Sequence, residues 1–378
     1  MTSSTPAAVP TLDRPERNLR SDYMNFAKLE SGATYALASS GVADCVMADL
    51  SPALSDFALH GPNAYGYGPL VERIAERFAV SPDHVVTAHG ASFSNHLAMA
   101  ALVSPGDEVL VEDPAYELLT ATLGYFQARV TRFERSPAEG WRLDPDRVAA
   151  ALTERTRLVV LTNLHNPTGD LAAPETIAAV AEAAARVGAR VLLDEVYLEL
   201  LFRSGEARTA FRPDGAIVVT SSLTKAYGLS GLRCGWILAP TALAQRMRRL
   251  NDLFASVPPH MAERLSVLAF DRLPALRVRA NTLIDANRAA YREILGRHPA
   301  LDQVMLDQGT TMFPRLIAED AEPFFRRLKA DYDTSVVPGH YFGRPDRIRI
   351  GLGGDIAMTR EGLRRIAMAL DGTPLTAM

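Results

Sequence analysis

The sequence predicts an α/β protein in which helices cover a mostly parallel sheet and a smaller α+β domain follows. From about residue 84 to 240, short runs rich in β-branched residues alternate with longer runs of helical periodicity. After Ser256 the chain changes to long amphipathic helices that carry many arginines. With 378 residues, of which 48% are hydrophobic, the chain can bury a large core. We therefore expect a large domain over residues 46–270 and a small domain built from residues 1–45 and 271–378.

The elements of the large domain follow one another in a regular order. The first strand is predicted at residues 84–89, HVVTAH, and is followed by a helix in SFSNHLAMAALV, a turn at PGD and a second strand at residues 108–113, EVLVED. Further strands are predicted in ARVTRFE, RLVVLTN, ARVLLDEV and AIVVTSS. The alanine-rich PETIAAVAEAAARVG predicts a helix, because Pro174 stands at its start and Gly188 at its end.

The remainder of the chain mixes both kinds of element. Helices are predicted at about 261–270 and 274–297, and later in AEPFFRRLKAD and TREGLRRIAMAL. Short strands are predicted in TTMFPRLI, TSVVP and RIRIGL. This mixture is typical of a small α+β domain, and we expect the first forty or so residues to join it in space.

Composition excludes several classes of function. The formal net charge of −4 is spread without blocks of like charge, so we expect no nucleic-acid partner and no membrane partner. The two cysteines and eight histidines lack the spacing of metal ligands, so we expect no metal site. The N-terminal segment lacks the apolar core of a signal peptide, and no apolar run reaches membrane-spanning length. We therefore expect a cytoplasmic protein.

Unusual polar motifs follow the predicted strands, where ligands bind in open parallel sheets. HGAS, at residues 89–92, could hold a phosphate with its backbone amides, or could be a tight turn beside a helix cap. HNPTG, at residues 165–169, is equally compatible with a structural turn. Asp194 ends the apolar strand of LDEVY, and a carboxylate there is costly unless it meets a cation or donors.

A fourth motif, SSLTKAYGLSGLRCGW at residues 221–236, contains one lysine and one arginine in an otherwise small and apolar stretch. Burial of Lys225 favours the neutral amine, which can attack a carbonyl to make a Schiff base. The hydroxyl of Ser222 and the guanidinium of Arg233 suit a phosphate. The structural alternatives are a lysine that reaches solvent and an arginine in a surface ion pair.

Together these motifs resemble the fold type I, pyridoxal-phosphate-dependent aminotransferases of class I/II, over about residues 60–370. In that family an asparagine in an NPTG turn precedes an aspartate in a DEVY-like strand end, a lysine in SxxK and an arginine eight residues later. The chain has the same order, in Asn166, Asp194, Tyr197, Ser222, Lys225 and Arg233. The resemblance implies the family's α/β fold and pyridoxal 5'-phosphate as cofactor.

The resemblance also implies roles for the catalytic residues. Lys225 is expected to be the Schiff-base lysine and to shuttle the proton between the substrate α-carbon and the cofactor. Asp194 is expected to pair with the pyridine nitrogen and keep it protonated. Asn166 and Tyr197 are expected to donate to the phenolate oxygen of the ring.

Further family positions concern the phosphate and the ring face. The resemblance assigns the phosphate to two side chains and three backbone amides, namely those of Ser222, Arg233, Gly90, Ala91 and Ser92. Tyr116, in EDPAY, matches the aromatic residue that stacks on the ring.

The resemblance also implies a substrate-binding residue in the predicted strand RIRIGLG. Arg349 matches the family's arginine that binds the substrate α-carboxylate in bidentate fashion, and Asn166 lies beside this subsite in the family. Arg347 is two residues away on the same strand face and is the alternative. VVPGHYFG, at residues 336–343, resembles the family's PGxxFG turn and favours Arg349.

In that family a tyrosine of the neighbouring subunit contacts the cofactor phosphate, and the resemblance is weaker at this position. NAYGYGPLVERIA, at residues 63–75, is the corresponding segment, and we assign Tyr65 to this role. The helix register nevertheless places His60 or Gly61 nearer the expected position.

Two substrate-binding assignments also depart from the family pattern. In ALASSGV, at residues 36–42, Ser40 is taken to approach the substrate, with Ser39 and Gly41 as alternatives. Asp252 stands four residues before Ser256, where the aspartate-specific branch has an arginine. An acid there disfavours dicarboxylic substrates and suits a basic or hydroxylated side chain, unless it is only a solvent-facing acid at a helix end.

The function that follows is a ping-pong aminotransferase that moves an amino group from an α-amino acid to an α-keto acid. The family builds its site at a two-fold interface, so we expect a homodimer with shared active sites. The main alternative is a carbon–sulfur lyase or cyclising synthase with the same cofactor, since the same lysine, aspartate and arginine serve both. A non-catalytic ligand sensor is a further alternative, which the complete residue set disfavours.

Overall fold

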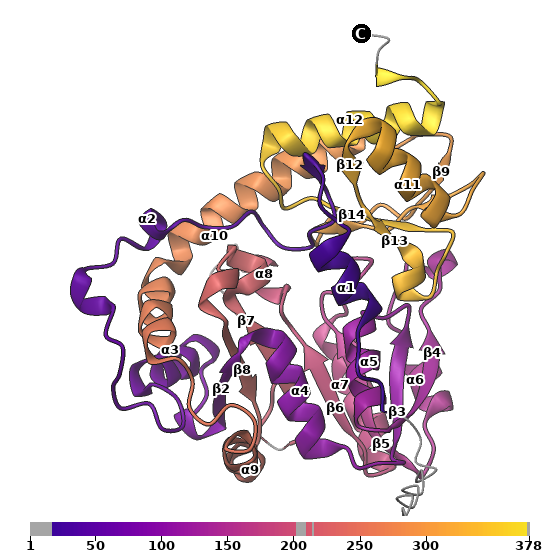
Figure 1. Cartoon of the computed structure of the whole chain (residues 1–378). Helices are drawn as coiled ribbons and strands as arrows, with labels where there is room; N and C mark the ends of the chain where they lie inside the picture. Colours follow the sequence, from indigo (N-terminus) through magenta and orange to yellow (C-terminus); the bar gives the residue numbers. More distant parts are fainter. Residues whose placement is uncertain (1–16, 202–208, 214, 376–378) are drawn as a thin grey trace, which may run out of the picture.

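A seven-stranded sheet forms the centre of the computed structural model, which describes residues 17–201, 209–213 and 215–375 (Figure 1). The strand order is β2-β8-β7-β6-β5-β3-β4, in which β8 runs antiparallel to both neighbours and the other pairs are parallel. This confirms the predicted α/β class. The strands are β2 (Val85–His89), β3 (Glu108–Asp113), β4 (Arg129–Glu134), β5 (Thr156–Thr162), β6 (Arg190–Asp194), β7 (Ile217–Ser222) and β8 (Cys234–Leu238).

Strand β8 was not among the strands predicted from the sequence. It pairs with β2 and β7, and its second residue, Gly235, lies against the backbone of Gly90. A Cβ at Gly235 would stand 2.4 Å from the carbonyl carbon of Gly90, so only glycine allows this approach. The short, mixed stretch CGWIL gives little strand pattern, and its pairing depends on neighbours that are distant in sequence.

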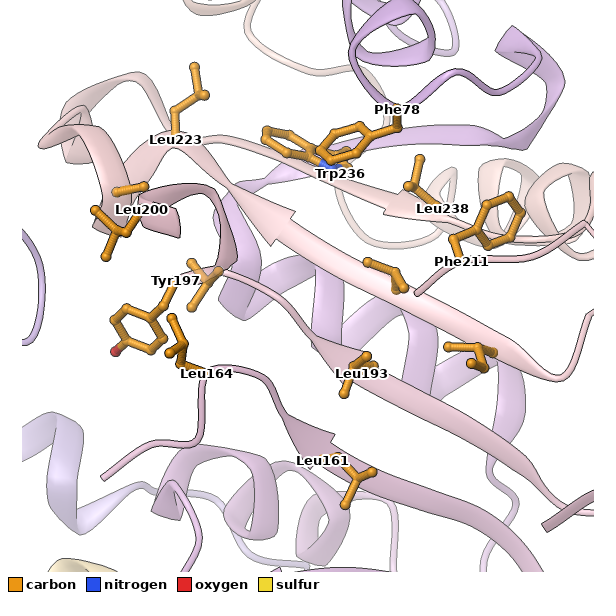
Figure 2. Packing of buried hydrophobic residues seen from close by; sticks show 14 of the residues in the cluster. Phe78, Leu161, Leu164, Leu193, Tyr197, Leu200, Phe211, Leu223, Trp236 and Leu238 are labelled. Carbon is orange, nitrogen blue, oxygen red and sulfur yellow. The ribbon is translucent and has the colours of Figure 1, made fainter. Parts of the chain in front are cut away.

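Helices cover both faces of the sheet. Successive side chains of a strand point to opposite faces, so in β6 Leu193 packs into one core and Leu192 into the other. Figure 2 shows the first of these cores, where Phe78 lies beside Trp236 with ring centroids 5.7 Å apart. The helices packed on this face are α3 (Gly68–Phe78), α6 (Pro145–Ala151), α7 (Pro174–Arg186) and α8 (Leu223–Tyr227). Those on the other face are α4 (Gly90–Leu102), α5 (Glu117–Tyr125) and α9 (Thr241–Asn251).

The prediction of two helices at 261–270 and 274–297 is wrong in one respect. The structure has a single helix, α10 (His260–Ile294), which contains Pro274 (Figure 1). A proline removes one helical hydrogen bond, but apolar residues on both sides of it, Leu273 and Leu276, are buried in the core of the large sheet. Tertiary packing therefore stabilises the continuous helix despite the hydrogen bond that is missing at Pro274.

The C-terminal part has its own core, to which both ends of the chain contribute. Tyr23 and Phe26 from α1 (Asp22–Leu29) pack in it with Phe324 and Ile366. β1 pairs in parallel with β12, so the N-terminal segment lies on the C-terminal part. The remaining elements are α2 (Met47–Leu50), α11 (Ala321–Tyr332), α12 (Ile356–Asp371), β1 (Tyr35–Ala36), β9 (Leu301–Asp302), β10 (Thr311–Met312), β11 (Arg315–Leu316), β12 (Thr334–Ser335), β13 (Val337–Pro338) and β14 (Ile348–Gly351).

The domain boundaries at residues 46 and 270 remain a prediction. Helix α10 runs without interruption through residue 270 and contributes to both cores. None of the described helices combines the length and the apolar character needed to cross a membrane.

Candidate active site

A cavity of about 220 Å³ lies where the carboxyl ends of β5, β6 and β7 meet α1 and α8. This is the edge at which open parallel sheets bind ligands. Ten of the residues singled out from the sequence line it: Ser40, Ala91, Ser92, Tyr116, Asn166, Asp194, Tyr197, Ser222, Lys225 and Arg233. The structure thus brings together most of a set that spans residues 40–233.

Asp194, the last residue of β6, is buried at the base of the cavity. Its Oδ2 accepts a hydrogen bond from Asn95 Nδ2 at 2.7 Å, and its Oδ1 accepts one from the amide of Val196 at 3.0 Å. The hydroxyl of Thr220 donates to Asn95 Oδ1 at 2.5 Å, which fixes the orientation of the amide. Burial raises the pKa of Asp194, while the Asn95 hydrogen bond and the charge of Lys225 oppose the rise.

Lys225 lies on α8, directly after β7, and is half-buried. Burial lowers the pKa of its amine, and the charges of Arg349 and Arg233 lower it further, while Tyr23 and Asp194 oppose this. Gly41 packs on it, since a Cβ there would stand 3.1 Å from Lys225 Cδ. The neutral amine, which is the nucleophilic form, is therefore favoured relative to an exposed lysine.

The turn that contains Asn166 connects the two sides of the cavity. Asn166 Oδ1 accepts from Arg349 Nη1 at 3.0 Å, and its Nδ2 donates to the hydroxyl of Tyr197 at 3.5 Å. That hydroxyl donates in turn to Ser40 Oγ at 2.8 Å. Ser40 is thus the residue of the 39–41 segment whose side chain meets the predicted site.

Arg349 is fully buried behind the cavity wall and does not line the cavity itself. Its Nη2 donates to the Tyr23 hydroxyl at 2.8 Å and to the Ala38 carbonyl at 2.9 Å, while its Nε has no partner. Within the described part of the chain its partners are all neutral, including the rings of Tyr23 and Phe342 beneath its guanidinium, so no carboxylate balances its charge. The alternative, Arg347, instead donates to the Phe313 carbonyl and lies over the Trp141 ring, away from the cavity.

The opposite end of the cavity is built for an anion. Arg233 is exposed at this end, and its guanidinium lies so close to Gly90 that a Cβ there would stand 2.4 Å from Nη2. Gly90 opens α4, so the amides of Ala91 and Ser92 belong to the first turn of a helix, where the macrodipole favours negative charge. Ser222 caps α8 by accepting from the amide of Thr224 at 3.3 Å.

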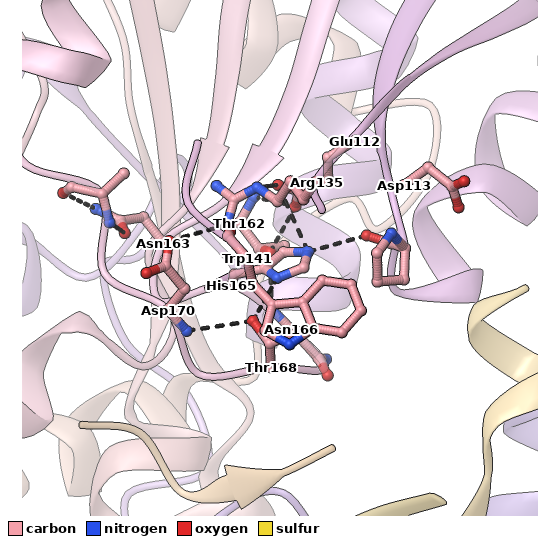
Figure 3. Close-up of polar contacts among 12 residues, drawn as sticks. Glu112, Asp113, Arg135, Trp141, Thr162, Asn163, His165, Asn166, Thr168 and Asp170 are labelled. Atoms are coloured by element: carbon pink, nitrogen blue, oxygen red, sulfur yellow. Dashed lines mark hydrogen bonds and ion pairs between the residues drawn. The ribbon is translucent and has the colours of Figure 1, made fainter. Parts of the chain in front are cut away.

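A buried charge network supports the turn that contains Asn166 (Figure 3). Arg135 lies between Glu112, at 3.2 Å, and Asp170, at 3.3 Å. Glu112 Oε1 accepts hydrogen bonds from the backbone amide and the hydroxyl of Thr162, both at 2.7 Å. The Thr162 hydroxyl in turn accepts from the backbone amide of Asn166 at 3.0 Å. Burial raises the pKa of Glu112 to about 7 against the opposing charge of Arg135. The network fixes the turn that presents Asn166.

Comparison with known families gives the decisive observation. The profile described as aminotransferase class I and II matches residues 27–366. The chain belongs to this family. The aminotransferase is similar to capreomycidine synthase of Streptomyces vinaceus, with 33% identity over 300 residues, 79% of this chain and 77% of the relative. It is also similar to the arginine–pyruvate transaminase AruH of Pseudomonas aeruginosa, with 32% identity over 371 residues and 92% of each chain.

Solved structures agree on the fold. A PLP-dependent aminotransferase from Streptococcus suis superposes with a TM-score of 0.85 at 21% identity, covering 96% of this chain and 99% of that one. The PLP-dependent cyclase OrfR superposes with a TM-score of 0.84 at 25% identity, covering 95% and 99%. The protein is thus an aminotransferase-family enzyme of fold type I, and its cofactor is pyridoxal phosphate.

The residues present fit this cofactor. The anion-binding end at Gly90 and Arg233 suits its phosphate, and the buried Asp194 carboxylate suits its pyridine nitrogen. The partly buried amine of Lys225 suits its aldehyde. The assignment of each residue to a part of the cofactor remains a prediction.

Besides Gly90 and Arg349, which adjoin the cavity, two predicted residues do not line the cavity of their own chain. Tyr65 is exposed and donates to Asp252 Oδ2 at 3.4 Å, so these two residues contact each other. Asp252 also forms an ion pair with Arg249 at 3.3 Å at the end of α9. Of the alternatives for Tyr65, His60 is exposed, and Gly61 lies against the ring of His260.

Seven cavity residues were missed in the sequence, among them Asn95 and Tyr23. Asn95 lies one helical turn after HGAS on α4, so the position of that motif at a helix start could have indicated that it faces the same site. Tyr23 carries no such signal, because it comes from the N-terminal helix and reaches the cavity only through tertiary packing.

Proposed function

We propose that the enzyme transfers the amino group of an α-amino acid to an α-keto acid by a ping-pong mechanism. The observation that carries this proposal is the fully buried guanidinium of Arg349, which has only neutral partners among the described residues. A buried, uncompensated cation is costly, and a substrate α-carboxylate is the anion that would compensate it. Amino acids and keto acids both carry this carboxylate, so one arginine can bind the substrate of each half-reaction of the exchange.

When bound, pyridoxal phosphate supplies an aldehyde for the amino group and a ring that accepts electrons from the α-carbon. The Lys225 amine, with its pKa lowered by burial, takes the proton from the α-carbon and returns it on the other side of the exchange. Asp194 keeps a proton at the pyridine nitrogen. Its charged form is stabilised by the Asn95 amide, which Thr220 orients.

The other residues bind and orient. Asn166 and Tyr197 would donate toward the phenolic oxygen of the cofactor once the Tyr197 hydroxyl turns from Ser40, and Tyr116 would stack on its ring. Ser222, Arg233 and the amides of residues 90–92 hold the phosphate. Arg349 orients the substrate by its carboxylate, so that the α-hydrogen points toward Lys225.

The experiment is to incubate the purified holoenzyme with a panel of L-amino acids and either pyruvate or 2-oxoglutarate. We expect alanine or glutamate to appear in step with the keto acid of the donor. Initial rates at several fixed acceptor concentrations should give parallel double-reciprocal lines, which identify a ping-pong exchange. A keto acid released with ammonia and without a new amino acid would contradict transamination and indicate a lyase.

A cyclising synthase is the second candidate. Capreomycidine synthase is among the relatives at 33% identity, and the cyclase OrfR shares the fold at 25% identity. The same lysine, aspartate and arginine serve this chemistry. A cyclised amino acid that forms without any acceptor keto acid would favour it over the exchange reaction.

We also propose a homodimer whose interface includes an exposed apolar face. The segment around residues 54–65 lies beside the start of α10, since Arg264 donates to the carbonyls of Ser55 and Asp56. Large apolar residues of these neighbouring segments are exposed: Leu54, Leu59, Tyr65, Leu253, Phe254, Val257 and Met261. Apolar residues gathered in this way mark an interaction surface, and a second copy would bring Tyr65 and Asp252 toward the partner's cavity.

Leu253→Glu is expected to break this dimer, because it places a charge at the centre of the exposed apolar face. Leu253 is 79% exposed, so the change should leave the fold of the monomer intact. Light scattering after size-exclusion chromatography should give a dimer for the wild type and a monomer for the variant. Ile317→Glu, at a residue 54% exposed on another part of the chain, is the matched control and should stay dimeric. A monomeric wild type would contradict the proposal.

The negative charge of Asp252 favours an amino donor with a basic side chain. The similarity to an arginine–pyruvate transaminase points to the same class of donor. Asp252→Ala is expected to lower kcat/KM for arginine about tenfold and to leave that for alanine unchanged, because one charge pair is lost. The kcat/KM values of both donors, measured for both proteins, check this. Better turnover of aspartate or glutamate than of arginine by the wild type would refute the assigned role.

A further inference from the structure

Tyr23 lines the cavity from α1 and stands next to Arg349, which lies behind the wall. We propose that Tyr23 is a substrate-binding residue whose hydroxyl donates a hydrogen bond to the same α-carboxylate that pairs with Arg349. The inference rests on the proposed function, since it assumes that this carboxylate is what Arg349 binds.

Packing fixes the position of the hydroxyl. The Tyr23 ring meets the Tyr116 ring edge to face, with centroids 5.3 Å apart, and a second ring, Tyr341, lies 5.9 Å away. The helix start is tied to α5, because the hydroxyl of Ser21 and the amide of Asp22 both donate to the Glu117 carboxylate. A ring held on both sides presents its hydroxyl to the site with little loss of freedom on binding.

The hydrogen-bond inventory leaves the Tyr23 proton available. The hydroxyl oxygen accepts from Arg349 Nη2 at 2.8 Å, and no acceptor for its own proton occurs among the residues that the structure describes. A carboxylate accepts about four hydrogen bonds, and a bidentate guanidinium supplies two of them, so acceptor sites remain for the Tyr23 hydroxyl. Tyr23 lines the cavity and its hydroxyl contacts the Arg349 guanidinium, so a carboxylate that reaches Arg349 also reaches this hydroxyl.

The surrounding charges strengthen this donor. Burial raises the pKa of Tyr23, but the charges of Arg349 and Lys225 outweigh burial, and the net effect is a lowered pKa. A more acidic phenol donates a stronger hydrogen bond to an anion. The Arg349 guanidinium thus attracts the carboxylate and also polarises the hydroxyl that receives it.

Tyr23→Phe tests the proposal because it removes only the hydroxyl. We expect KM to rise about tenfold for every amino donor and for the keto-acid acceptor, whatever the side chain, with a smaller change in kcat. The dissociation constants of two unreactive carboxylates, 3-phenylpropionate and 5-guanidinopentanoate, should rise by a similar factor when measured by calorimetry on the holoenzyme. Tyr341→Phe, which removes a hydroxyl from the neighbouring ring, is the matched control and should change neither quantity.

Each other outcome contradicts the proposal in a distinct way. A fall in KM would mean that Tyr23 only blocks access to Arg349. A rise in KM for one class of amino donor alone would mean that Tyr23 contacts the side chain of the donor. A loss of kcat at unchanged KM would mean that it acts on Lys225, and unchanged binding of both carboxylates would mean that the hydroxyl is idle. If the wild type transfers no amino group, the proposed function fails, whereas weaker carboxylate binding by Tyr23→Phe would still support the contact.

Discussion

Lys225→Ala is expected to lower the rate of amino-group transfer by about 10⁴-fold or more, because one amine both holds the cofactor and moves the α-proton. Its pKa is lowered by burial, and it lies on α8 at the edge of the sheet where the cavity opens. No other described lysine lines the cavity, so no neighbouring amine can replace it. Single-turnover rates with the best amino donor measure the loss.

The small number of lysines in the chain makes the covalent bond between Lys225 and the cofactor easy to test. Lys28, Lys225 and Lys329 are its only lysines, although Lys and Arg together number 40. Borohydride reduction of the holoenzyme should therefore add the mass of the reduced cofactor to the peptide that contains residue 225 and to neither of the others. Lys329→Ala, at a partly exposed residue of α11, is the matched control and should keep both the label and the rate. Labelling that persists in Lys225→Ala, or a colourless holoenzyme, would contradict the assignment.

The part of the site that could be predicted from the sequence lies on consecutive strand ends. Asn166, Asp194 and Lys225 each follow a buried strand within a few residues. Parallel strands bring their carboxyl ends to one edge, so local motifs were enough to assemble this set. Ser40, in contrast, could be chosen over Ser39 and Gly41 only when the structure placed it against the Tyr197 hydroxyl.

The part that could not be predicted depends on contacts between distant segments. Tyr23 reaches the cavity because α1 packs on α5, nearly a hundred residues away in sequence. Strand β8 forms because Gly235 fits against Gly90, and α10 continues through Pro274 because its flanks are buried. Neither helix periodicity nor strand propensity contains this tertiary information. The same limit applies to Tyr65 and Asp252, whose proposed roles depend on the proposed second subunit.

Asp194→Asn is expected to lower the rate about 10³-fold while it leaves the shape of the cavity unchanged. The amide oxygen can still accept from Asn95 Nδ2 or from the backbone amide of Val196, but not from both, because the other oxygen of the carboxylate becomes an NH2 group. What is lost is the negative charge that holds a proton on the pyridine nitrogen. The same single-turnover assay measures this loss, and the absorption spectrum shows whether cofactor is still bound.

The stability of the cofactor-free protein separates this electrostatic role from a structural one. Burial raises the pKa of Asp194 above its value in the unfolded chain, so its folded form favours the protonated carboxyl. Its contribution to stability is therefore present at low pH and is lost as the pH rises through the raised pKa. At neutral pH the neutral amide avoids the burial of a charge, which offsets the lost hydrogen bond, so Asp194→Asn should have a similar melting temperature without cofactor. A lower melting temperature together with lost activity would indicate a structural residue, and near-normal turnover would overturn the catalytic role of Asp194 directly.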